Sequence, residues 1–176
     1  MLPGSLTMKT VLAALALLSA TVVSPLVGQG DEDYTRKTLA GLKVVYVVVE
    51  PIKDDAERDG LRGDQVSTDV ELTLRQAGIT VLGGEQGTFP AGTALLYVNV
   101  HAFKSPGMDV YAYSVEVQLH QQVRLLRNPT VTVLTATWST GSLGLAGPAY
   151  LSSVREVVRD QIDKFINAYL AANPKR

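Results

Sequence analysis

Two histidines, His101 and His120, carry the side chains that titrate nearest to neutral pH, so they are the first candidates for acid–base or metal chemistry. Each falls on the polar side of an alternating segment, and the two segments, 95–102 and 111–125, are expected to pair as antiparallel strands. In the predicted register His101 lies beside Ala112. His120 is eight residues farther along that strand, so at about 3.3 Å per residue the two histidines are more than ~20 Å apart. The two imidazoles are therefore not expected to share a metal ion, and no serine or acid is placed by sequence to form a triad with either.

Three glycines, Gly141, Gly144 and Gly147, recur at every third position between a predicted strand and a predicted helix, where backbone amides can bind a phosphate. Their spacing matches neither the dinucleotide fingerprint nor the P-loop, and no lysine follows them. No strand is expected after the last helix to complete a βαβ unit. We therefore interpret the segment GSLGLAGP as a flexible connection.

The tripeptide Arg62-Gly63-Asp64 matches a sequence that adhesion receptors read in some ligands. It lies where a helix is expected to begin, and Asp64 suits the N-cap or the first helical turn. We therefore interpret it as the start of a helix.

Aromatic residues form a further candidate group, made of Tyr97, Tyr111, Tyr113, Trp138 and Tyr150. Aromatic side chains on neighbouring strands usually build the core beneath a helix. If the second face of the sheet is open, those on that face could stack against sugar rings. We expect them to be core.

Five strands and two helices are expected to position these side chains. Hydrophobic periodicity places strands at 42–50, 79–82, 95–102, 111–125 and 130–139, and helices at 64–77 and 150–170. The Val-rich run 42–50 lacks polar alternation, which indicates a strand covered on both faces. The order β-α-β-β-β-β-α predicts an α+β fold, with a mostly antiparallel sheet of about five strands and two helices packed on one face.

The polar side of the two central strands is the candidate interaction face. We expect Val98 to lie opposite Val115, a register that pairs apolar side chains on the buried face. The same register puts six polar residues on the other face: Asn99, His101, Ser114, Glu116, Gln118 and His120. A polar strip of this kind suits a hydrated protein interface.

The first thirty residues predict export. Residues 1–10 hold one charge, Lys9, and are followed by the apolar run VLAALALLSA, which leads to small residues. The run is shorter than the roughly 20 residues that span a bilayer. We expect cleavage after Gly30, with Met8 as an alternative start, leaving a flexible segment 31–41 and one α+β domain at 42–172.

Composition narrows the function. The chain has no cysteine, so the exported protein can form no disulfide and its signal peptide offers no cysteine for a lipid anchor. Of 16 basic and 17 acidic residues, removal of Lys9 leaves 15 and 17, so the processed chain is nearly neutral. A general role in binding nucleic acid or anionic membranes is therefore not expected.

The layout resembles the small α/β domain of bacterial envelope proteins. The matching pieces are the opening strand LKVVYVVVE, the helix end LRQAGITV and the last helix VREVVRDQIDKFINAYL. Proteins with such a domain include the activator lipoproteins of penicillin-binding proteins, the curli secretion lipoprotein and the Tol-system β-propeller protein. The resemblance implies a non-catalytic accessory domain and transfers no functional residue.

Three function classes follow. The first is a periplasmic or secreted interaction module, neither an enzyme nor a cofactor carrier, which binds an unknown envelope protein and keeps no stable membrane anchor. The second is a small-ligand carrier with a cavity between sheet and helices. The third is an exported hydrolase, although the acids lie mainly on helix exteriors and the N-terminal segment.

Overall fold

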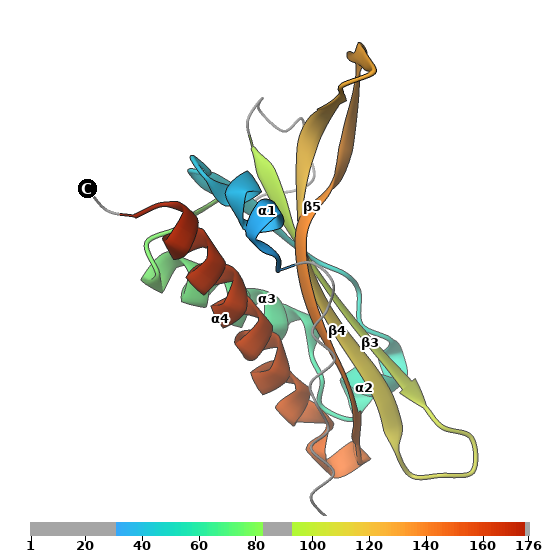
Figure 1. Cartoon of the computed structure of the whole chain (residues 1–176). Helices are drawn as coiled ribbons and strands as arrows, with labels where there is room; N and C mark the ends of the chain where they lie inside the picture. Colours follow the sequence, from blue (N-terminus) through green and yellow to red (C-terminus); the bar gives the residue numbers. More distant parts are fainter. Residues whose placement is uncertain (1–30, 83–92, 175–176) are drawn as a thin grey trace, which may run out of the picture.

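A five-stranded sheet carries the fold, and two long helices cover one of its faces (Figure 1). The computed structural model describes residues 31–82 and 93–174; the predicted signal peptide lies outside them. The strands are β1 (Val44–Val49), β2 (Thr80–Leu82), β3 (Ala94–Lys104), β4 (Tyr111–Leu125) and β5 (Asn128–Ala146). The helices are α1 (Asp33–Arg36), α2 (Asp54–Arg58), α3 (Gly63–Gln76) and α4 (Val154–Ala172), with 3-10 turns η1 (Lys37–Leu39) and η2 (Pro148–Ser153).

The α+β class and the single five-stranded sheet are confirmed, but the sheet is mixed rather than mostly antiparallel. Its strand order is β2-β1-β3-β4-β5. β1 pairs in parallel with both β2 and β3, whereas β3, β4 and β5 pair antiparallel. The chain between β1 and β2 passes through α3, and a crossover of this kind returns the chain in its starting direction.

The register between the two central strands differs from the prediction by two residues. Val98 pairs with Val117 rather than with Val115. A shift of two residues keeps every side chain on its predicted face, because the strand period is two.

Apolar stripes at helical spacing hold both long helices on the sheet, as predicted. α3 buries Val66, Val70 and Leu74, and α4 buries Val158, Ile162 and Phe165. Each such side chain contributes roughly 1.5–3 kcal/mol when fully buried. Among the described residues, no helix is both long and apolar enough to cross a bilayer.

The N-terminal segment 31–41 forms α1 and η1, which differs from the flexible segment that the sequence predicts. Leu39 is fully buried in the core. Asp31 accepts a hydrogen bond from the indole nitrogen of Trp138 at 3.0 Å. The segment 31–41 is therefore anchored to the domain by one buried leucine and one specific polar contact.

The glycine-rich segment is strand rather than a flexible connection, so that prediction is wrong. β5 continues through Gly141 and Gly144, and Gly144 pairs with Tyr113. A Cβ at Gly144 would collide with the Tyr113 ring, and one at Gly141 would lie 3.0 Å from the carbonyl oxygen of Val115. Glycine is needed at 144 because an aromatic ring covers that backbone, a reason that spacing along the chain does not reveal.

Candidate interaction face

The face of the sheet opposite α3 and α4 carries all six residues of the predicted interaction face. Along β3 and β4 the buried side chains alternate with side chains that point away from the helices. The cross-strand pairs Asn99–Glu116 and His101–Ser114 place these side chains next to one another. We call the set Asn99, His101, Ser114, Glu116, Gln118 and His120 the polar strip.

Hydrogen bonds link most of the polar strip. On β4, His120 Nε2 lies 2.7 Å from Gln118 Oε1, and the Gln118 amide donates to Glu116 Oε1 at 2.7 Å. On β3, Asn99 Nδ2 lies 3.1 Å from His101 Nε2. These contacts join residues two apart on the same strand, so the alternation of the strand itself brings them together.

One atom of the polar strip has no partner. Asn99 Oδ1 is buried and accepts no hydrogen bond, and it is the single such side-chain atom among residues 31–82 and 93–174. A buried polar group without a partner costs about 1–3 kcal/mol. The strip therefore contains an unsatisfied acceptor, and a donor from outside reaches it only when the side chains that cover it move.

Apolar side chains flank the polar strip at both ends. At one end the ring of Tyr97 packs on the imidazole of His120, with centroids 5.6 Å apart. At the other end, Ser114 pairs with Leu143 and Ala112 pairs with Leu145 on β5, and both leucines are more than 70% exposed. The open face thus combines a polar centre with apolar flanks, which is the reverse of the common apolar centre with a polar rim and suits a hydrated contact rich in hydrogen bonds.

The two histidines lie apart on this face. His101 pairs with Ser114, whereas the predicted register places it beside Ala112. Ser114 and His120 are six residues apart on β4, so the two histidines are separated by ~20 Å along the strand. Within the described part of the chain, no group of three or more histidine or acidic side chains is placed to hold a metal ion. Each imidazole instead contacts the side-chain amide of a neighbour.

The Arg62-Gly63-Asp64 tripeptide starts α3, as predicted. Arg62 is the N-cap residue and Asp64 lies in the first turn. The two side chains bind each other, with Arg62 Nε 3.0 Å from Asp64 Oδ1. This hydrogen bond lowers the pKa of Asp64 below its ordinary value.

The aromatic residues divide between the core and the surface. Tyr111 and Trp138 are fully buried and Tyr113 packs against the core, as predicted. Tyr150 is 72% exposed in η2, and Tyr97 lies on the open face, so these two differ from the prediction. The Tyr111 hydroxyl donates to Asp59 Oδ2 at 2.8 Å, and burial together with that carboxylate raises the pKa of Tyr111 to about 12.

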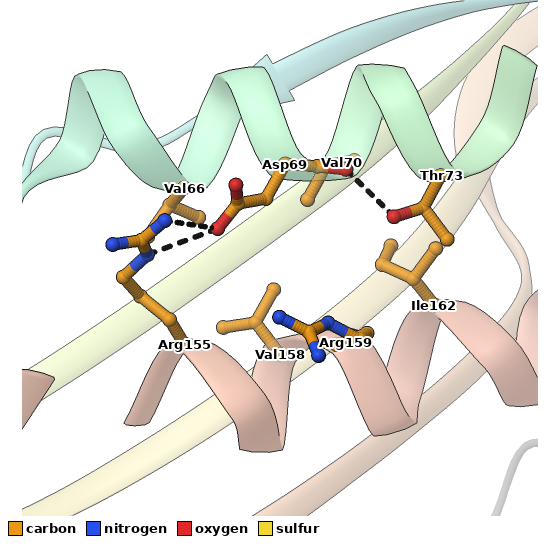
Figure 2. A pocket seen from close by; sticks show the side chains of 8 residues that line it. All are labelled: Val66, Asp69, Val70, Thr73, Arg155, Val158, Arg159 and Ile162. Carbon is orange, nitrogen blue, oxygen red and sulfur yellow. Dashed lines mark hydrogen bonds and ion pairs between the residues drawn. The ribbon is translucent and has the colours of Figure 1, made fainter. Parts of the chain in front are cut away.

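A small hollow lies between α3 and α4 (Figure 2). Arg155 on α4 spans it and donates to Asp69 on α3 through two nitrogens, at 2.9 and 2.6 Å. The cavity holds about 10 Å³, which is room for one water molecule. Its lining is Val66, Asp69, Val70, Thr73, Arg155, Val158, Arg159 and Ile162.

No protein-family model matches the chain, and no curated protein matches it. Among solved structures, two PelC dodecamers from Paraburkholderia phytofirmans are similar to it, one of them a point variant. The variant is 20% identical with a TM-score of 0.37, and the other is 19% identical with a TM-score of 0.38. In both cases the similarity covers 75% of this chain and 86% of the PelC chain.

Proposed function

We propose that this protein is an exported, non-catalytic interaction module of the cell envelope and that the polar strip is its contact surface. The signal-like N-terminus and the layout resemblance to envelope domains support the location. The contact surface is supported by the geometry of the open face. A partner protein on this face would meet fixed hydrogen-bonding groups with apolar side chains at both ends.

The observation that most strongly supports the proposal is the unpartnered side-chain oxygen of Asn99. A free protein is more stable when such a buried acceptor is satisfied or replaced by an apolar group, so its presence is a cost to the isolated chain. A partner that displaces the side chains over Asn99 Oδ1 and brings an N–H or O–H donor to it removes that cost on binding. The strip therefore fits a partner whose surface presents a donor flanked by apolar groups.

The contacts of the two histidines support a binding role over a catalytic one. His120 contacts Gln118, and His101 contacts Asn99. A general base in a hydrolase is instead hydrogen-bonded to a nucleophile and oriented by an acid. In the polar strip the histidines are positioned by amides, an arrangement suited to recognition.

The proposal is tested by affinity capture from envelope extract followed by mass spectrometry. We expect the exported protein to retain a reproducible partner, and the triple variant Glu116→Ala, Gln118→Ala, His120→Ala to lose it. The matched control carries Glu156→Ala, Asp160→Ala and Asp163→Ala on the exposed side of α4. Equal capture by both triple variants would overturn the proposal, as would a retained small molecule in place of a protein.

A further inference from the structure

β5 leaves one side of its backbone unpaired. It ends the strand order β2-β1-β3-β4-β5, and among the described residues no strand pairs with its outer side. The opposite edge strand, β2, has 3 residues, whereas β5 has 19. An edge of that length presents a row of N–H and C=O groups that can pair with another strand.

The features that normally protect an edge are confined to the first part of β5. Pro129 lies there, and both register shifts with β4 occur before Thr140. The N-terminal segment also contacts that part, where the Thr38 hydroxyl lies 3.4 Å from the Thr137 carbonyl oxygen. From Thr140 to Ala146 the pairing with β4 is regular, and β5 carries no charged side chain anywhere.

Two exposed leucines lie on this unprotected segment. Leu143 is 74% and Leu145 is 73% exposed, and both point away from the helices. Natural edge strands usually place a charge at such positions to prevent pairing. Here the edge offers aliphatic surface beside free backbone groups.

We infer that residues 140–146 of β5 pair antiparallel with the same segment of a second copy of this chain. An uncharged strand is complementary to itself, because no like charges meet when it pairs around a two-fold axis. Pairing that is centred on Leu143 uses all seven residues of the segment. It sets Leu143 opposite its own copy and Leu145 opposite Gly141, so that the leucines of both chains lie on one face.

The resulting dimer has a ten-stranded sheet, five strands from each copy. A two-fold axis perpendicular to the sheet keeps the helices of both copies on one side and both polar strips on the other. A dimer would then contact a partner twice, and the second contact would benefit from a high effective concentration. The dimer itself does not depend on the proposed function of the strip.

Sedimentation velocity between roughly 1 and 100 μM tests the pairing on the exported protein, with its N-terminus read by mass spectrometry. We expect a reversible dimer, and at least a tenfold rise in its dissociation constant for Leu143→Lys, since two ammonium groups would lie directly opposite each other. Leu134→Lys is the control, because Leu134 is 51% exposed on the first part of the same strand. A monomer at every concentration overturns the inference, as does a dimer that Leu143→Lys leaves intact.

Charge complementation tests the register and guards against a variant that is merely misfolded. Leu143→Lys and Leu143→Glu should each dimerise at least tenfold more weakly alone than the unmodified protein, and they should form a heterodimer when mixed. Because the chain has no cysteine, Leu143→Cys introduces a single thiol, which should form an intermolecular disulfide that Leu134→Cys does not. Failure of the mixture to associate, or equal cross-linking at both positions, contradicts the pairing at Leu143.

Discussion

The indole nitrogen of Trp138 donates a hydrogen bond to Asp31 Oδ1 at 3.0 Å, across 107 residues of sequence. The same carboxylate accepts two hydrogen bonds from Arg36, at 2.7 and 2.9 Å. Trp138 is almost fully buried and packs edge-on against Phe165. Asp31, which follows the predicted signal peptide, is therefore tied directly to the edge strand β5 and, through Trp138, to α4.

Replacing Asp31 should loosen this attachment. Asp31→Ala leaves the buried indole N–H of Trp138 without an acceptor, which should lower the free energy of unfolding by about 1–3 kcal/mol. Trp138 is the only tryptophan in the sequence, so urea unfolding followed by its fluorescence reports the change. Asp33→Ala is the control, since the Asp33 side chain, two residues farther along in α1, is 95% exposed. Equal unfolding midpoints for the two variants would contradict the role of Asp31.

Stability should also fall at acid pH through Asp31. The hydrogen bond from Arg36, followed by that from Trp138, holds the pKa of Asp31 below its ordinary value of 3.8 in the folded protein. A lowered folded pKa means that the contribution is complete above the ordinary value and is lost as pH falls through the folded value. Urea midpoints measured between about pH 6 and pH 2 should therefore decline less steeply for Asp31→Asn than for the unmodified protein. Parallel declines would show that Asp31 is not linked to folding.

At alkaline pH the fold should lose stability through the ionisation of Tyr111. Burial, and then the Asp59 carboxylate, raise its pKa to about 12. A raised folded pKa gives a contribution that is present below the ordinary value of 10.0 and lost as pH rises toward 12. Absorbance at the phenolate band should show one tyrosine that titrates late, and Tyr111→Phe should remove that step. The variant should also lose about 1 kcal/mol with the hydrogen bond to Asp59.

Gly144 should not tolerate a side chain. Gly144→Ala places a methyl group against the Tyr113 ring, which should destabilise the fold by about 1–3 kcal/mol. Gly147→Ala is the matched control, because a Cβ there would meet its nearest neighbour, Tyr150, at 3.8 Å, an ordinary contact. Adding Tyr113→Ser to Gly144→Ala should recover part of the loss in thermal unfolding. No recovery would mean that the cost of the alanine arises elsewhere.

The sequence predictions are correct where the deciding pattern is local along the chain and wrong where the deciding contact comes from a distant residue. α3, α4 and β4 were predictable because each carries a periodic apolar pattern within its own residues. The register of β3 against β4 was missed by two residues, since a pattern of period two fits equally well after such a shift. The continuation of β5 through Gly144 was missed because its reason is a ring 31 positions earlier, on β4.

The polar strip was likewise predictable from the sequence only in part. Alternation along β3 and β4 was sufficient to assign its six residues to one face. The unpartnered Asn99 oxygen was not predictable, because it depends on which neighbours bond to one another across and along two strands. The unprotected part of β5 was hidden by the interpretation of its glycines as a connection.

Asn99→Leu tests the central claim most directly, because it should abolish binding while the free protein keeps its stability. Asn99→Leu removes a buried acceptor that has no partner and also the contact between Asn99 Nδ2 and His101 Nε2. Because His101 is exposed to water, the free protein should keep its stability within about 1 kcal/mol, measured as the urea midpoint. The same variant should fail to capture the envelope partner that the unmodified protein retains, while the α4 control variant captures it normally. Full capture by a stable Asn99→Leu protein would contradict the proposal that the polar strip is the contact surface.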